Sequence, residues 1–276
     1  MLEIQTMEAL GNDFIVVDAV SQSVNPDEEP NIIKKCLEQF NFDQLLLIEP
    51  PTDKSADLKL KIYNVDGSLA ENCINGVRAV ALYAFDENLV SENHLLLQLE
   101  KSLAKITKTD DALFSVEMKD FSFAKASCNI ADTSELEFDF EGKTICFEPV
   151  AVGNPHAVVF QEVDSEKIPE IGAALQESDI YQKGVNVGFV SVVESNEIDL
   201  RVVERGVGET LACGSGACAA ALCGVKNGLL NSPTKVNFNK GHLLVDVYLE
   251  ENSFKLTGGA TSVSYTHLRA HETAMY

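Results

Sequence analysis

Two cysteines lie in settings that could make their thiols reactive. Cys213 follows a strand-like run, Ile198 to Val203, and a glycine-rich turn, and it precedes Gly214-Ser215-Gly216 and a run of small apolar residues. Cys73 has a comparable setting in the first half of the chain, where Ile74-Asn75-Gly76 follows it. A cysteine at the start of a helix lies among unpaired N–H groups and at the positive end of the helix dipole, which favours the thiolate. The same N–H groups can bind a carboxylate.

Two such thiols could invert a stereocentre if the two helix starts faced each other. One thiolate would remove a Cα proton, and the opposite thiol would deliver a proton to the other face. Thiols suit this reaction because their pKa lies near the working pH, so both protonation states are accessible. N–H groups at the helix starts would stabilise the charge that develops on the substrate carboxylate. We therefore predict neither a cofactor nor a metal. The alternative is that both cysteines are buried packing residues near turns.

Composition limits the class of protein. The chain has 276 residues, enough for two domains of ordinary size, and 45% apolar residues, typical of a globular protein. Its net charge of −22 argues against nucleic acids and anionic membrane surfaces as partners. The seven cysteines form no Cys-x-x-Cys pair, and the first residues lack the pattern of a signal peptide. We expect a cytoplasmic protein with reduced thiols that acts on a small amino-acid substrate. A homodimer is compatible with the sequence.

Hydrophobic periodicity predicts many short strands and one apolar helix in each half. Val77 to Phe85 and Ala217 to Val225 are apolar nearly all round, which is typical of helices buried inside a sheet. Surface helices are predicted over residues 31–40 and 165–177. We expect an α+β fold of two similar domains, residues 1–117 and 118–263, each a mixed or antiparallel sheet wrapped around its helix.

The last residues, 264–276, differ from the rest of the chain. They contain two of the five histidines and show neither strand alternation nor a helical face. They look more like translated vector sequence than like a protein end. We predict a non-native tail that replaces the final strand, and we exclude it from the interpretation.

Several motifs occur in the order found in a known family. They are Leu10-Gly11-Asn12-Asp13-Phe14, Phe42-Asp43-Gln44, Asn64-Val-Asp-Gly-Ser, Cys73-x-Asn75-Gly76-x-Arg78, Gly153-Asn154-Pro155-His156, Asn186-Val187, and Glu204-Arg205-Gly followed by Glu-Thr-Leu-Ala-Cys213-Gly-Ser-Gly. Together, from residue 1 to about residue 263, they resemble the diaminopimelate epimerases. The resemblance implies two pseudo-symmetric domains with the site between them, and a chain end that returns to the first domain. It implies an isomerase that converts L,L- to meso-diaminopimelate without a cofactor, in the pathway to lysine and peptidoglycan precursors.

The resemblance also implies a role for each motif residue. Cys73 and Cys213 would be the acid–base pair. The reacting carboxylate would be bound through helix-start N–H groups by Asn75, Gly76, Gly214 and Ser215. The substrate's amino and carboxyl ends would be recognised by Asn12, Gln44, Asn64, Asn154, Asn186, Glu204 and Arg205. His156 and Glu204 would support catalysis, His156 by helping to set the protonation of the thiols.

One position departs from the family, which has glycine where this chain has Ile74. A positive φ there would strain a β-branched residue, whereas ordinary helical angles would only narrow the pocket. Three alternatives therefore stay open. The first is a cofactor-independent racemase of another amino acid. The second is a cysteine hydrolase that uses Cys213 with His156. The third is an inactive binding homologue.

Overall fold

The computed structural model describes residues 2–24, 29–70, 73–91, 93–119, 121–131 and 135–268. The chain forms two compact units. Unit 1 contains the residues up to Phe114 and those from Gly259 onward, and unit 2 contains Ser115–Gly258. The predicted division after residue 117 lies close to the first boundary. Residues 259–263, which we placed in the second domain, belong instead to unit 1, because residues from 261 onward pair with a strand of that unit.

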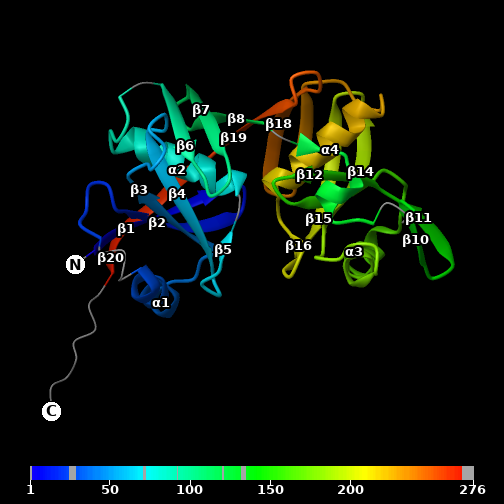
Figure 1. Cartoon of the computed structure of the whole chain (residues 1–276), viewed down its shortest axis with the longest axis horizontal. Helices are drawn as coiled ribbons and strands as arrows, with labels where there is room; N and C mark the ends of the chain where they lie inside the picture. The colour runs from blue at the N-terminus through cyan, green and yellow to red at the C-terminus, as the bar shows by residue number, and fades with distance from the viewer. Residues whose placement is uncertain are drawn as a thin grey trace, which may run out of the picture. The chain divides into compact units, whose positions relative to one another are not determined.

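Unit 1 is a mixed sheet around a buried helix, α2 (Ile74–Asp86). Its strands are β1 (Leu2–Ala9), β2 (Asn12–Asp18), β3 (Gln44–Glu49), β4 (Leu58–Asn64), β5 (Leu69–Ala70), β6 (His94–Gln98), β7 (Leu103–Asp110) and β20 (Thr261–Leu268). β1 pairs antiparallel with β2 and β20, β2 pairs parallel with β3, and β3 pairs antiparallel with β4. A second helix, α1 (Glu29–Gln39), packs Ile33 and Cys36 against the other face of the sheet, and Figure 1 shows its position.

The chain passes between the units inside β8 (Leu113–Lys119) and inside β19 (Ser253–Gly259). Unit 2 repeats the plan around α4 (Gly214–Lys226), which contacts strands on all sides (Figure 1). Its other strands are β9 (Phe121–Ser122), β10 (Glu137–Phe140), β11 (Lys143–Cys146), β12 (Glu148–Val152), β13 (Pro155–Val159), β14 (Asn186–Glu194), β15 (Glu197–Glu204), β16 (Gly208–Thr210), β17 (Thr234–Phe238) and β18 (Gly241–Tyr248). Short helices η2 (Lys125–Cys128) and η3 (Ser165–Lys167) and the helix α3 (Ile168–Glu177) complete it.

Burial explains why α2 and α4 form. Both helices have 13 residues, and nearly every side chain of each is buried. Alanine, valine and glycine keep them thin enough for strands to pack on every side. The predicted fold class, with one apolar helix inside each sheet, is confirmed. Among the helices that the structure describes, none is both long and apolar enough to cross a membrane.

The strand β9 ends after Ser122, and η2 follows it. The Ser122 hydroxyl accepts hydrogen bonds from the Ala124 amide and the Ser127 hydroxyl, and such local bonds favour a turn over a strand.

The structure corrects the expectation that the tail replaces the final strand. Residues 264–268 continue β20, with Leu268 opposite Leu2 in the antiparallel register with β1. All side chains from Thr261 to His267 are exposed or half-buried. Backbone pairing with β1 therefore holds this strand, and it forms without an alternating apolar pattern in its sequence. Leu268 itself is buried in a cluster with Ile4 and Ile15. Residues 269–276 lie outside the described residues, and the non-native origin of the tail stays a prediction.

Candidate active site

Both cysteines cap their helices at the N-terminus. Cys73 precedes α2 with extended backbone angles (φ −150°, ψ 98°), and its Sγ accepts a hydrogen bond from the Gly76 amide at 3.4 Å. Cys213 precedes α4 (φ −135°, ψ 112°), and its Sγ accepts from the Gly216 amide at 3.4 Å. Each sulfur therefore lies at the N–H end of a buried helix, the position that favours a thiolate.

The third residue of each helix is a glycine because the helix start packs closely on a neighbour. A Cβ at Gly76 would lie 3.0 Å from Cδ2 of Leu46 in β3. A Cβ at Gly216 would lie 3.1 Å from Cγ2 of Val202 in β15 and 3.2 Å from the Cβ of Cys213. These separations are tighter than most side-chain contacts, so a larger residue would displace the capped helix start.

Ile74 is the first residue of α2 and is 2% exposed. It does not occur among the positive-φ residues in the described part of the chain. The helix therefore holds a β-branched residue here without left-handed strain, and of the two readings of this position the one with ordinary helical angles is correct.

The two units place their polar residues in matching positions. Asn64 ends β4 and Glu204 ends β15, at the same sequence distance before Cys73 and Cys213. Gln44 opens β3 opposite Asn64, and Asn186 opens β14 beside the pair Val187–Val203. Asn12 and Asn154 each follow a glycine with positive φ, Gly11 and Gly153. The predicted site residues thus occupy corresponding strand ends, turns and helix starts in the two units.

In unit 1 the amide side chains are joined in pairs. Gln44 Nε2 donates to Asn64 Oδ1 at 3.0 Å, and Asn64 Nδ2 donates to the Ser68 hydroxyl at 3.1 Å. Asn75 Nδ2 donates to Asn12 Oδ1 at 2.6 Å. Asn12, Gln44 and Asn64 are half-buried, whereas Asn75 is buried.

In unit 2 the predicted site residues include charged groups. Asn186 Oδ1 accepts the Arg205 backbone amide at 2.9 Å, and Glu204 Oε1 accepts the Thr210 hydroxyl at 2.5 Å. The exposed Arg205 side chain donates to the Lys183 carbonyl at 2.9 Å. It passes so close to Gly184 that a Cβ there would lie 2.6 Å from Arg205 Cδ.

His156 is buried, and burial lowers its pKa to about 3. Its Nε2 lies 2.9 Å from Asn154 Oδ1, and it pairs with Asn186 in the parallel register of β13 and β14. The ring is therefore neutral at neutral pH. Any influence of His156 on a thiol must act through hydrogen bonding rather than through a positive charge.

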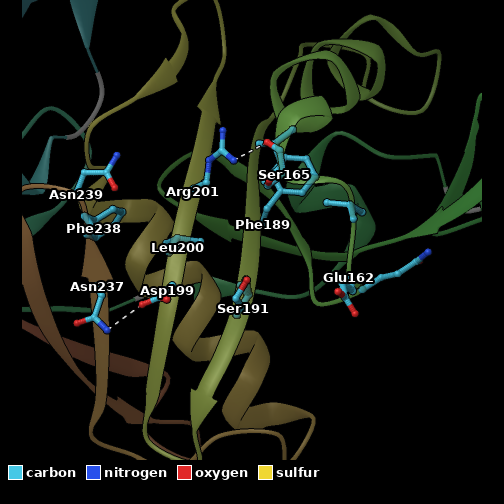
Figure 2. Close-up of a pocket in the computed structure, with 14 residues that line it drawn as sticks. Glu162, Ser165, Phe189, Ser191, Asp199, Leu200, Arg201, Asn237, Phe238 and Asn239 are labelled. Carbon is cyan, nitrogen blue, oxygen red and sulfur yellow. Dashed lines mark hydrogen bonds between the residues drawn. The ribbon is translucent and has the colours of Figure 1, made fainter.

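A cavity of about 420 Å³ lies elsewhere in unit 2 (Figure 2). Phe189, Leu200 and Phe238 line it together with polar side chains, but it contains none of the predicted site residues. Arg201 beside it is bonded to both carboxylate oxygens of Glu209 and to the Ser165 carbonyl, and Asn237 donates to Asp199. These groups support the sheet. Within the described residues, no group of three or more His, Cys, Asp or Glu side chains could hold a metal ion.

Sequence reasoning missed the supporting contacts of Ser68, Thr210 and Arg78. Ser68 and Thr210 hold Asn64 and Glu204, and Arg78 donates to Asn75. All three lie inside the recognised motifs. For Ser68 and Thr210, the signal that could have found them is a hydroxyl residue between the strand end and the helix start in both halves.

Comparison with known proteins gives a consistent result. Residues 5–123 and 149–263 match the family model described as diaminopimelate epimerase. The chain is 35% identical to the diaminopimelate epimerase of Chromobacterium violaceum, over 95% of this chain and 97% of that protein. It is equally similar to the enzyme of that name from Nitrosomonas europaea, with the same coverage, and 36% identical to that of Burkholderia ambifaria over 88% of this chain and 89% of the relative.

Solved structures share the fold at low identity. A hydroxyproline epimerase from Agrobacterium vitis aligns with a TM-score of 0.69 at 12% identity, covering 96% of this chain and 91% of that one. A predicted epimerase from Pseudomonas aeruginosa aligns with a TM-score of 0.68 at 16% identity, covering 98% of this chain and 100% of that one. At these identities the likeness shows the fold alone.

Proposed function

Because this chain belongs to the diaminopimelate epimerase family, we propose that it is an isomerase that converts L,L-diaminopimelate to meso-diaminopimelate, with Cys73 and Cys213 as its acid–base pair. The observation that carries the proposal is the matching position of the two thiols. Each caps a buried helix, and each sulfur accepts an N–H from the third helical residue.

The proposed reaction moves one proton off the substrate and one onto it. A thiolate removes the Cα proton, and the electron pair of the broken C–H bond is delocalised into the substrate carboxylate. Helix-start N–H groups, those of Asn75 and Gly76 or of Gly214 and Ser215, would stabilise that charge. The second thiol then donates its proton to the opposite face of Cα and becomes the thiolate. The two cysteines exchange protonation states, so no oxidant and no cofactor is consumed. The proposal requires the two sulfurs to reach opposite faces of Cα.

The remaining polar residues suit a diamino-dicarboxylate. Such a substrate needs donors for two carboxylates and acceptors for two ammonium groups. Arg205 could bind a carboxylate bidentately, and the Glu204 carboxylate could accept from an ammonium group. The amides of Asn12, Gln44, Asn64, Asn154 and Asn186 could serve either end.

The hydrolase alternative loses support from the environment of His156. A ring whose pKa is held at about 3 by burial is a weak base for activating the Cys213 thiol. The helical geometry at Ile74 likewise removes backbone strain as a reason for inactivity. Ile74 would narrow the substrate pocket relative to the glycine of the family, which keeps a different amino-acid substrate as an alternative. Turnover of a panel of amino acids tests that alternative.

We also propose that the enzyme works in the cytoplasm, on the route to lysine and peptidoglycan precursors. The mechanism requires reduced thiols, and the seven cysteines are free in the structure. The acidic chain is expected to have a small-molecule substrate and no nucleic-acid or membrane partner, and a homodimer stays open.

Proton NMR of L,L-diaminopimelate in D₂O with the reduced full-length protein tests the proposal. We expect the Cα–H signal to disappear as the meso isomer forms. The thiols exchange their protons for solvent deuterium, so deuterium rather than hydrogen is then delivered to Cα. An intact Cα–H signal in the presence of folded protein would reject the proposed function. Loss of signal from histidine or another monocarboxylate at a much higher rate would reject diaminopimelate as the substrate.

A further inference from the structure

Arg78 is a buried cation for which the proposed reaction assigns no role. It lies one turn into α2 and is 0% exposed. Its Nε donates to the Gly259 carbonyl at 3.2 Å, its Nη1 to the Ile74 carbonyl at 3.4 Å, and its Nη2 to Asn75 Oδ1 at 3.0 Å. Burying a guanidinium is costly unless its donors are bonded. The matching position in α4 is held by buried Cys218, so packing alone does not require an arginine.

The guanidinium determines which way the Asn75 amide points. Arginine can only donate hydrogen bonds, so the atom of Asn75 that faces it must be the oxygen. Asn75 Nδ2 is then directed to the other side, where it donates to Asn12 Oδ1 at 2.6 Å. Asn12 Nδ2 in turn points away from Asn75 and donates to Asp43 Oδ2 at 3.4 Å. Arg78 at one end and the Asp43 carboxylate at the other thus fix the direction of both amides, and the second N–H of Asn12 Nδ2 can donate to a ligand.

We propose that Arg78 is a positioning residue, which acts through Asn75 to hold the Asn12 oxygen inward, so that the Asn12 N–H that is not bonded to Asp43 faces a carboxylate of the bound amino acid. The inference rests on the proposed function, since it assumes a carboxylate ligand at Asn12. In the reverse orientation of this relay, which runs from Arg78 through Asn75 to Asn12, the Asn12 oxygen would face that carboxylate and repel it.

In unit 2 the corresponding asparagine side chain has the same orientation but a different neighbour. Asn154, which matches Asn12, has its Oδ1 within 2.9 Å of Nε2 of the buried, neutral His156. That oxygen is therefore engaged by the protein, and the Nδ2 end is the one directed away from the ring. Both units hold the asparagine that follows the turn glycine by its oxygen, which is the arrangement needed to offer donors to an anion.

A double-mutant cycle between Arg78→Met and Asn12→Ala tests the relay in the full-length enzyme. We expect Arg78→Met to raise the KM for L,L-diaminopimelate by about tenfold, the equivalent of one good hydrogen bond, and to change kcat by less than about threefold. In the Asn12→Ala background the same substitution should raise KM by less than about twofold, because there is no amide left to orient. Arg78→Lys, which keeps a buried donor, should recover part of the affinity. If Arg78→Met raises KM equally in both backgrounds, or lowers kcat at unchanged KM, Arg78 is structural and the proposal fails.

Asn75→Asp tests the middle of the relay if Arg78→Met does not fold. The carboxylate keeps the bond to Arg78 but cannot donate to Asn12, so the Asn12 oxygen loses the donor that holds it inward and KM should again rise by about tenfold. An unchanged KM would contradict the relay.

A ligand-free measurement separates this inference from the proposed function. In ¹⁵N–¹H spectra of the unliganded protein, with the Asn12 side-chain NH₂ pair identified by its loss in Asn12→Ala, we expect that pair to shift in Asn75→Asp. If the pair shifts in Asn75→Asp but the wild-type protein does not epimerise diaminopimelate, the function is rejected and the positioning is kept. If the wild-type protein is active but the Asn12 pair does not shift in Asn75→Asp, the positioning alone is rejected.

Discussion

Sγ of Cys213 lies 3.5 Å from the hydroxyl oxygen of Ser215, two residues further along the chain. In the first unit the corresponding position is Asn75, whose amide is bonded to Arg78 and Asn12. The two thiols therefore share a helix-cap position but are followed at the second helical residue by different side chains, a hydroxyl after Cys213 and an amide after Cys73.

This contact predicts a selective effect of Ser215→Ala. A hydroxyl that donates to the sulfur stabilises the thiolate, so its removal should slow alkylation of Cys213 by iodoacetamide by about threefold to tenfold near neutral pH. Peptide mass spectrometry after timed alkylation measures the rate. Cys73 in the same sample is the internal control and should react at its wild-type rate. Equal slowing of both cysteines, or of neither, would show that the Ser215 hydroxyl does not act on Cys213.

Replacing either capping cysteine should stop epimerisation. Cys73→Ala and Cys213→Ala each remove one positioned acid or base, a loss of at least about 10²–10⁴-fold in kcat. Cys218→Ala is the matched control, because Cys218 is buried inside α4 and outside the proposed pair. The rate of meso-diaminopimelate formation measures the effect. If Cys73→Ala keeps wild-type turnover, the two-thiol mechanism is wrong.

The buried histidine predicts a pH-dependent stability. Burial lowers the pKa of His156 to about 3 from the ordinary 6.5. Below about pH 6.5 the unfolded chain binds a proton at this ring that the folded chain does not, so stability falls as the pH falls and is constant above that value. The contribution is up to about 1.4 kcal/mol per pH unit.

Urea unfolding of the wild-type protein and of His156→Gln, at about pH 5.5 and about pH 7.5, isolates this contribution from that of the carboxylates. The wild-type protein should lose more stability between the two conditions than the variant does. Equal losses would mean that His156 is protonated in the folded protein.

The last strand predicts where the chain can be shortened. β20 ends at Leu268 and is the antiparallel partner of β1, which carries the core residues Ile4 and Met7. A chain that ends at Leu268 should therefore melt within about 2–4 °C of the full chain, the equivalent of about 1 kcal/mol. A chain that ends at Ala260 lacks the strand, leaves β1 as an open edge, and should melt well below that or aggregate. Differential scanning fluorimetry compares them, and equal melting temperatures would show that β20 does not stabilise unit 1.

Much of this protein follows from its sequence alone. The apolar runs after Cys73 and Cys213 could only be satisfied inside a sheet, because helices without a polar face must be covered on all sides. The motif residues before each helix start likewise lie at strand ends and turns, where short polar side chains and positive-φ glycines are required.

Other features depended on contacts between residues far apart in the chain. The angles at Ile74, the neutral state of His156 and the pairing of Leu268 with Leu2 arise from packing and burial, which local periodicity does not encode. The link from Arg78 through Asn75 to Asn12 spans α2 and the start of β2. Sequence therefore determined which residues are candidates for the chemistry, and tertiary structure decided how each is oriented, because hydrogen-bond direction is set only once donors and acceptors are brought together.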